Sequence, residues 1–236
     1  MRPVERGDIP TDAKGQSKQY NQYNQAQPDL ISRIGEYCSY CERPIKTNLA
    51  VEHIQSKNSQ PQLELSWNNF LLACTNCNST KSTKVRDDIT QSYYYWPSLD
   101  NTFRVFVYKP SGMIEINSAL KAFAYAKAQK TLKLTGLDRH PNTLNKPSPK
   151  DKRWLHRQEA WDLAYLAKTQ LAQNNNPKMR NFIVMNAKIQ GLWSIWMTVF
   201  HDDFDMLNRL IQAFPGTCCL CFDSNGQPVH GLRGEL

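Results

Sequence analysis

Two cysteine pairs constrain this chain of 236 residues more than any other feature. Cys38–Cys41 and Cys74–Cys77 each have the form Cys-x-x-Cys, and 32 residues separate one pair from the other. Each such turn presents two thiolates, so four cysteines complete a tetrahedral structural zinc site. The separation exceeds the usual spacing of a zinc ribbon. We therefore expect a hairpin inserted between the pairs; the alternative is four unliganded buried cysteines.

The segment between and after the cysteines predicts a strand, a loop, a strand and a helix. Residues 49–54 have strand composition, residues 56–66 are polar and contain a proline, and residues 70–72 are a short second strand. The residues after Cys77 favour a helix that Ser79 or Thr80 would cap.

The candidate catalytic and metal-binding residues of this segment are Glu52, His53 and Asn78. Neighbouring residues of a strand point to opposite faces, so a bend is needed to bring Glu52 and His53 to one site. Histidine suits the deprotonation of water near neutral pH. Carboxylate and amide oxygens suit Mg²⁺, so Glu52 and Asn78 predict a catalytic Mg²⁺ or Mn²⁺ ion distinct from the zinc.

The pattern over residues 38–81 resembles the zinc-stabilised HNH (ββα-metal) endonucleases. It reads C-x-x-C, then apolar-Glu-His-apolar, then Trp-x-Asn, then C-x-x-C-Asn-x-x-Lys. The resemblance implies that His53 is the general base, with Glu52 and Asn78 as ligands of the catalytic ion. Two departures are a glutamate where the family usually has aspartate or histidine, and a loop without the common glycine pair.

The same resemblance assigns roles to residues nearer the second cysteine pair. Asn69 would order the histidine-bearing loop through hydrogen bonds, and Asn68 is the alternative if the register slips by one. Lys81 stands where the family often has a phosphate-contacting lysine. We expect nucleic-acid contacts from the basic residues of the module, with a solvated face as the alternative: Lys57, Lys81, Lys84 and Arg86.

The charge of the chain is uneven. The net charge is +8, which by itself only weakly favours nucleic acid. Residues 121–157 hold ten Lys and Arg against two Asp. This stretch predicts salt-sensitive contacts with nucleic acid or with an acidic partner surface.

We expect an α+β chain in three parts. Residues 1–35 form an N-terminal arm that a partner would order, with a disordered tail as the alternative. Residues 36–90 form the zinc-stapled module. Residues 91–236 form a β-hairpin (103–108 and 113–116), a connection (132–152) and a mainly helical domain.

The apolar stripes of the helical domain predict three core-facing helices. They are Ala160, Leu163, Ala164, Ala167 and Leu171; Phe182, Met185, Ile189, Leu192, Trp193, Trp196 and Phe200; and Phe204, Leu207, Leu210, Ile211 and Phe214.

The third cysteine cluster is harder to interpret. Cys218, Cys219 and Cys221, with His230 nearby, could form a second metal site. Adjacent cysteines suit one tetrahedral ion poorly, so buried free thiols are the expectation.

The longer architecture resembles the HNH (PtuB-like) proteins of Septu-type and retron-associated bacterial antiphage systems. That resemblance implies a partner ATPase of the ABC/SMC-like class, and a retron reverse transcriptase with its RNA–DNA product. We expect a bacterial cytoplasmic protein without a membrane span, since the most apolar run, residues 182–200, is broken by polar side chains.

Two functions from different classes follow. The first is a metal-dependent HNH endonuclease that hydrolyses phosphodiester bonds of nucleic acid. The alternative is a non-catalytic zinc-stabilised module that binds nucleic acid or a partner.

Overall fold

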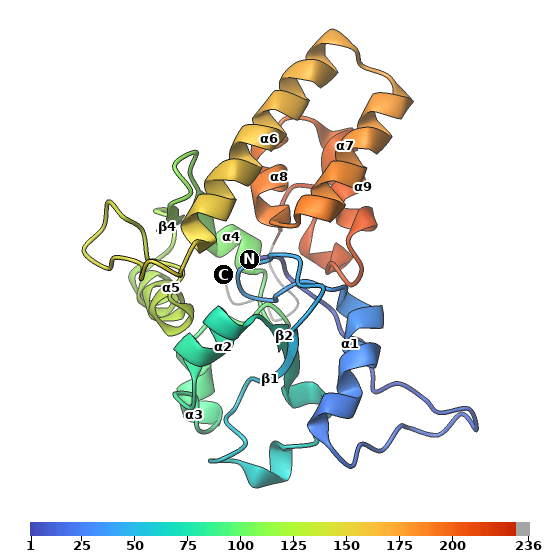
Figure 1. Cartoon of the computed structure of the whole chain (residues 1–236), viewed down its shortest axis with the longest axis vertical. Helices are drawn as coiled ribbons and strands as arrows, with labels where there is room; N and C mark the ends of the chain where they lie inside the picture. Colours follow the sequence, from blue (N-terminus) through green and yellow to red (C-terminus); the bar gives the residue numbers. More distant parts are fainter. Residues whose placement is uncertain (230–236) are drawn as a thin grey trace.

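The computed structural model describes residues 1–229 as two small antiparallel hairpins surrounded by helices (Figure 1). This is the expected α+β class. The elements, in chain order, are α1 (Gln27–Ile34), β1 (Ala50–His53), β2 (Phe70–Ala73), α2 (Thr75–Lys81), α3 (Asp88–Ser92), α4 (Thr102–Val105), β3 (Phe106–Tyr108), β4 (Ile114–Ile116), α5 (Ala122–Thr135), α6 (Arg153–Gln173), α7 (Pro177–Gln190), α8 (Trp193–Val199) and α9 (Phe204–Ala213).

The first hairpin follows the expected order of strand, loop, strand and helix. Ala50 pairs with Ala73 and His53 with Phe70. Helix α1 packs on β2 and α2 packs on β1, so every residue of β2 is buried. The predicted cap was wrong: α2 begins earlier, because the Cys74 sulfur accepts the Cys77 N–H at 3.5 Å and Cys74 is the N-cap.

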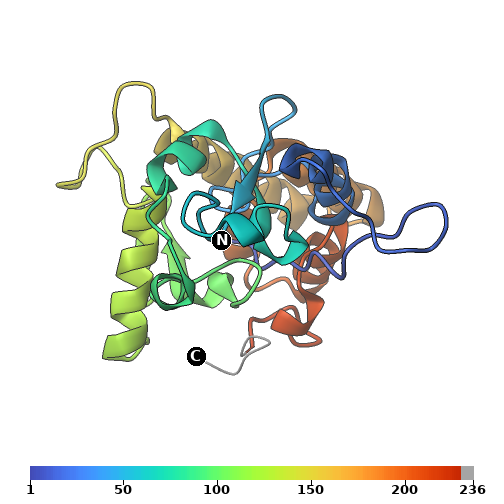
Figure 2. The same cartoon turned by 90° about the horizontal axis from the view of Figure 1, so that it is seen from below.

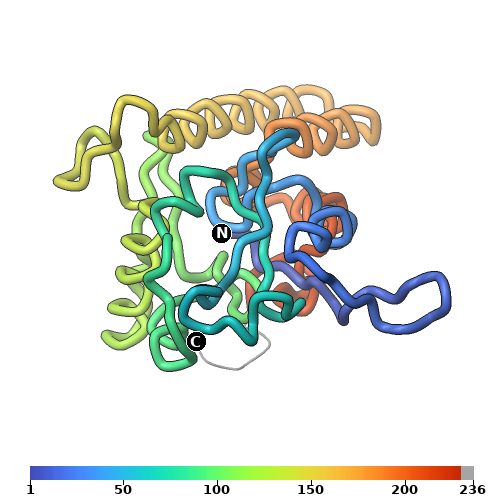
Figure 3. Tube along the Cα trace, turned by 60° about the horizontal axis from the view of Figure 1, so that its bottom comes forward, coloured from blue at the N-terminus to red at the C-terminus, as the bar shows by residue number. Residues whose placement is uncertain are grey.

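The N-terminal residues are part of the core rather than the expected arm. Met1 is fully buried and Val4 is 3% exposed. The Val4 N–H donates to the carbonyl of Pro97, and the Cys218 N–H donates to that of Pro3. The N-terminus accordingly lies near the middle of the molecule, whereas the loop at residues 8–20 projects from one side of the molecule (Figures 2 and 3). An unanticipated helix, α1, follows this loop.

The second hairpin is shorter than predicted, and a helix was missed after it. Strands β3 and β4 pair as expected, but residues 102–105 form the helical turn α4 instead of extending the strand. Residues 122–135 form α5, which includes the start of the predicted 132–152 connection. Helix α5 packs on both α2 and β4, so it joins the second hairpin to the module.

Helices α6 to α9 form the part of the molecule opposite the first hairpin (Figure 1). The expectation of one core-facing stripe over residues 182–200 was wrong for its first half. Phe182, Met185 and Ile189 are 60%, 60% and 68% exposed, whereas Trp193 and Trp196 are buried. The helix breaks between the two halves, so the two segments present different faces. Phe204 in the third stripe is also exposed, and α9 ends before Pro215 as predicted.

The break occurs where the helices meet the first cysteine turn. Gly191 has φ +66°, and a Cβ there would lie 2.7 Å from the Glu42 carbonyl oxygen. The Glu42 carboxylate accepts the Ser194 N–H at 2.8 Å and the Ser194 hydroxyl at 2.6 Å. One continuous cluster of buried apolar side chains therefore spans the first hairpin and helices α8 and α9.

No helix within residues 1–229 is both long and apolar enough to cross a bilayer.

Two isoleucines of α7 provide a matched test of this packing. Ile183 is 1% exposed and Ile189 is 68% exposed. Ile183→Ala should lower the free energy of unfolding by about 2–5 kcal/mol, because it leaves a cavity. Ile189→Ala should change it by no more than about 0.5 kcal/mol. Urea denaturation measures both, and equal losses would contradict the exposed face of α7.

Candidate functional site

The four cysteines converge on one point between the first hairpin, α2 and α6. Their sulfur atoms all lie within 4.8 Å of one another, and all four side chains are buried. The sulfurs of Cys41 and Cys74 are 3.7 Å apart. Four sulfurs around zinc at about 2.3 Å would be separated by about 3.8 Å in a tetrahedron. The cluster therefore fits a structural zinc ion.

The four buried thiols shift one another's pKa values in opposite directions. Hydrogen bonds from Cys38 and the other two thiols lower the pKa of Cys74 far below its ordinary value. Burial instead raises the pKa of Cys38 and Cys77. Negative charge gathered on buried sulfur requires compensation by a cation.

Arg153, the first residue of α6, supplies positive charge beside the cluster. Its Nη1 donates to the Cys77 sulfur at 3.1 Å and to the Thr135 carbonyl at 2.8 Å. Its Nη2 pairs with Asp151 at 2.7 Å. Burial disfavours this charge, but the hydrogen bonds to Asp151 and the charge on Cys77 outweigh burial and raise the pKa of Arg153. The helical part is thus bonded directly to the cysteine cluster.

His53 lies at the end of β1 with its ring held from two sides. Its Nε2 lies 2.9 Å from the Glu64 carbonyl oxygen. A carbonyl only accepts, so Nε2 carries the proton and a neutral ring keeps its lone pair on Nδ1. The rings of Tyr23 and Phe70 contact the imidazole at centroid distances of 5.0 and 5.3 Å. Burial lowers the pKa of His53, with Lys57 adding to this effect, so the neutral form is favoured.

Glu52 and Asn78 line the same open pocket as His53, with a volume of about 220 Å³. The predicted strand bend is absent: β1 keeps regular pairing through Glu52 and His53, and the chain bends only after His53. Glu52 is buried, and its Oε1 lies 2.8 Å from the Lys81 ammonium. Lys81, expected to contact phosphate, is instead 1% exposed, and it also donates to the His53 carbonyl at 2.7 Å. Burial raises the pKa of Glu52, and the Lys81 charge opposes that rise.

Asn69 and Asn68 have different surroundings. The Oδ1 of Asn69 accepts the Gln55 N–H at 2.8 Å. Its Nδ2 donates to the carbonyls of Gln55 and Leu63 at 3.0 and 3.2 Å. These bonds close the loop between the two strands, next to the Glu64 carbonyl that holds His53. Asn68 is exposed and makes no side-chain hydrogen bond to residues 1–229.

The other basic residues predicted to bind nucleic acid lie on the surface of the module. Lys57 borders the pocket, pairs with Glu64 at 3.1 Å and lies 4.2 Å from the centre of the Tyr23 ring. Lys84 and Arg86 are exposed beyond the end of α2. Within the basic stretch 121–157, Arg153 and Arg157 are buried and so cannot face solution.

Sequence reasoning missed Tyr23, Arg153 and the Glu64 carbonyl. A backbone carbonyl gives no residue-type signal, and Tyr23 lies in a segment whose composition suggested an arm. Arg153 belonged to a stretch interpreted as a surface charge run.

The third cysteine cluster does not form a metal-binding group among residues 1–229. Cys218 and Cys221 are buried with their sulfurs 2.8 Å apart, and Cys219 is exposed. The predicted participant His230 lies outside the described residues.

Comparison with known families bears on the first cluster and the hairpin. Residues 38–84 match the family model described as HNH endonuclease. The matched segment contains both cysteine pairs, the hairpin and α2, and the match supports an HNH nuclease module at this position. No curated protein matches the chain.

Arg153→Met should weaken zinc binding by about 10–100-fold, because it removes the cation and donor beside Cys77. Arg153→Lys should retain part of the affinity, and the exposed neighbour Lys152→Met should retain all of it. Competition with a chromophoric chelator measures the three affinities. Unchanged affinity in folded Arg153→Met would show that this contact does not support the metal.

Asn69→Ala should lower the free energy of unfolding by about 1–3 kcal/mol, because the amides of the loop lose buried partners. The loop at residues 55–63 should also exchange its amide hydrogens faster. Asn68→Ala should have an effect within about 0.5 kcal/mol. Equal effects of the two variants on unfolding and exchange would contradict the loop-ordering role of Asn69.

Proposed function

We propose that this chain is an HNH endonuclease that hydrolyses phosphodiester bonds with His53 as general base. The observation that carries the proposal is the hydrogen bond between the Glu64 carbonyl and His53, a residue that lines one pocket together with Glu52 and Asn78. This bond fixes the tautomer that can accept a proton on Nδ1. The HNH match over residues 38–84 supports the same reaction class.

The chain's own residues account for proton transfer and orientation. A water molecule next to His53 loses a proton to Nδ1, and its oxygen forms a bond to phosphorus as the bond to the leaving oxygen breaks. The leaving oxygen keeps the bonding electron pair and takes a proton from solvent water. Burial keeps the ring neutral before the reaction. Asn69 fixes the loop that carries the Glu64 carbonyl, so the ring keeps its orientation. Lys57 lies at the rim of the pocket, where a phosphate would approach.

Glu52 and Asn78 are the residues that would hold a divalent cation. Their carboxylate and amide oxygens are the donors that Mg²⁺ and Mn²⁺ prefer, and both line the pocket. Such an ion supplies charge stabilisation to the phosphate oxygens. The Lys81 ammonium contacts the same carboxylate, so Lys81 and the ion would compete for Glu52.

One observation favours the alternative of a non-catalytic binding module. The Glu52–Lys81 ion pair already neutralises the carboxylate inside the fold. A module stabilised in this way can bind nucleic acid through its surface lysines without a second metal. Dependence of cleavage on a divalent cation separates the two functions.

We also infer that the protein acts in the bacterial cytoplasm as the effector subunit of an antiphage complex. The PtuB-like resemblance motivates an ABC/SMC-like ATPase partner, together with a retron reverse transcriptase and its RNA–DNA product. The exposed Phe182, Met185 and Ile189 on α7 offer a surface for such a subunit. Copurification of the native complex would test this assignment, and recovery of the chain alone would count against it.

His53→Ala should reduce cleavage by about 100-fold or more, because the proton acceptor is lost. The assay uses DNA and RNA substrates with Mg²⁺ or Mn²⁺ and with EDTA, and includes the native complex if the chain alone is inactive. His201→Ala, an exposed histidine away from the pocket, is the matched control and should retain full activity.

Zinc content should be unchanged in His53→Ala, and the protein should stay folded with a lower melting temperature, because the ring contacts with Tyr23 and Phe70 are lost. Metal-dependent cleavage that persists in this variant would exclude His53 as the base. Absence of cleavage by the wild-type complex under every condition, with nucleic-acid binding retained, would favour the binding module.

A further inference from the structure

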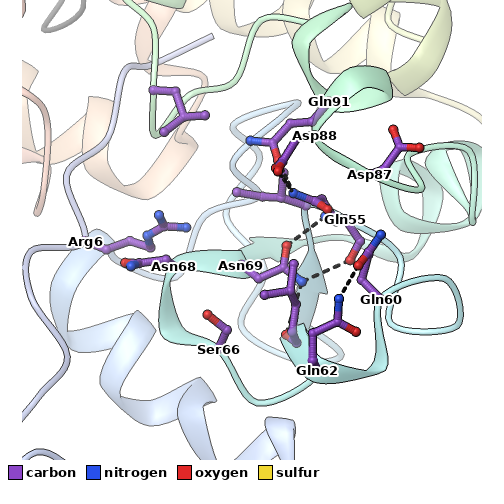
Figure 4. Close-up of a pocket in the computed structure, with 13 residues that line it drawn as sticks. Arg6, Gln55, Gln60, Gln62, Ser66, Asn68, Asn69, Asp87, Asp88 and Gln91 are labelled. Atoms are coloured by element: carbon purple, nitrogen blue, oxygen red, sulfur yellow. Dashed lines mark hydrogen bonds between the residues drawn. The ribbon is translucent and has the colours of Figure 1, made fainter.

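A second and larger cavity lies on the other side of the loop that holds His53. Its volume is about 590 Å³, within the range of about 300–1,000 Å³ that is typical of small-molecule sites. Figure 4 shows that polar side chains surround it: Arg6 enters from one side, and Gln55, Asp88 and Gln91 converge from another. None of these residues has a part in the proposed hydrolysis.

Arg6 is a buried cation that has no countercharge among residues 1–229. The side chain is 9% exposed and forms no ion pair with residues 1–229. Its Nη1 donates to the Phe70 carbonyl, and the remaining guanidinium donors have no protein partner in the described chain. Burial lowers the pKa of Arg6 to about 10. A desolvated guanidinium that borders a cavity is suited to a bidentate anion such as phosphate.

The α3 side of the cavity offers a different set of groups. Gln55 is 7% exposed, and its Nε2 donates to Asp88 Oδ1 at 2.8 Å and to Gln91 Oε1 at 2.6 Å. Both donors of this amide are used, so its Oε1 is left as an acceptor. The second carboxylate oxygen of Asp88 and the amide nitrogen of Gln91 make no side-chain hydrogen bond within residues 1–229. Within residues 1–229, two acceptors and one donor are therefore unused at this wall of the cavity, and Asp88 is exposed to solvent.

This set matches one nucleobase edge. Guanine presents two neighbouring N–H donors, N1–H and N2–H, beside the O6 acceptor. Adenine, cytosine and uracil each lack that combination. Ile54, Leu63 and Leu99 supply apolar surface in the same cavity for the faces of a base.

We propose that this cavity binds a guanine nucleotide, with its phosphate on Arg6 and its base on Gln55, Asp88 and Gln91. The nucleotide is either free or one unit of a nucleic-acid strand. The strand form rests on the proposed nuclease function, whereas the free form does not.

The cavity is connected to the active-site loop. Asn69 and Leu63 border the cavity, and Asn69 donates to the Leu63 carbonyl one residue before Glu64. Arg6 donates to the carbonyl of Phe70, whose ring contacts His53. A nucleotide in the cavity therefore touches the residues that orient His53, and should slow amide exchange across residues 55–69.

The test is calorimetric titration of the full chain carrying His53→Ala, without added divalent cation. The ligands are GMP, guanosine, AMP, CMP and UMP. GMP should bind about tenfold or more tightly than each of the others, a difference of about 1.4 kcal/mol. Because these ligands contain no phosphodiester bond that the proposed reaction could hydrolyse, this result is independent of whether His53 is the catalytic base.

Three further variants, each combined with His53→Ala, test phosphate binding and base binding separately. Arg6→Gln should remove the difference between GMP and guanosine, and Asp88→Asn should remove the preference for GMP over AMP. Arg33→Gln is the matched control, because its guanidinium lies beside Gly7 but does not border the cavity. It should leave both differences intact. If Arg6→Gln does not fold, the preference for GMP over AMP, measured with and without Asp88→Asn, decides whether the proposal stands.

A guanine-containing tetranucleotide distinguishes the two sources of the nucleotide. Displacement of GMP by this strand identifies a site for the substrate strand, and failure to displace identifies a site for the free nucleotide. If neither GMP nor the strand binds at millimolar concentration, the proposal is overturned. Binding that neither Arg6→Gln nor Asp88→Asn alters would also overturn it.

Discussion

The convergence of four buried thiols is the constraint on which the rest of the structure depends. The hairpin is only four residues long on each side, and its helix has seven residues, so neither would be stable in isolation. A zinc ion in the cluster would contribute about 10–16 kcal/mol of apparent binding energy. The contact from Arg153 to Cys77 extends this effect to α6, since the charge on sulfur attracts the guanidinium. The carboxylate of Glu42, next to Cys41, accepts the Ser194 N–H and so holds the start of α8 beside the cysteine cluster.

The parts of the fold that the sequence predicted are those where local pattern and burial agree. The two strands of the first hairpin and the end of α9 were predicted because short apolar runs and a Pro-Gly stop act locally on the chain. Three failures had non-local causes. Met1 and Val4 are held in the core by contacts with distant residues, which include Thr102 and Glu42 for Met1 and Pro97 for Val4. The apolar stripe of α7 faces solvent because the chain turns at Gly191. Cys74 caps α2 because metal-site geometry places its sulfur there.

The candidate site also contains some features that the sequence predicts and others that only the tertiary structure defines. Residue types and spacing were sufficient to bring His53, Glu52 and Asn78 together as a hypothesis, and the structure places all three around one pocket. The internal pairing of Glu52 with Lys81 could not be predicted, since a lysine after a metal-binding motif suggests a phosphate contact equally well. The Glu64 carbonyl and the Arg6 guanidinium, which has no ion pair within residues 1–229, take their places only through tertiary structure, and they connect the two cavities through one loop.

We propose that the four cysteines hold a structural zinc ion and that His53 stays free of it to act as a base. X-ray absorption at the zinc edge of the purified full chain tests this division. We expect one zinc per chain with four sulfur ligands at about 2.3 Å and no nitrogen or oxygen ligand. Zinc bound through an imidazole nitrogen, or a folded chain that contains no zinc, would contradict it.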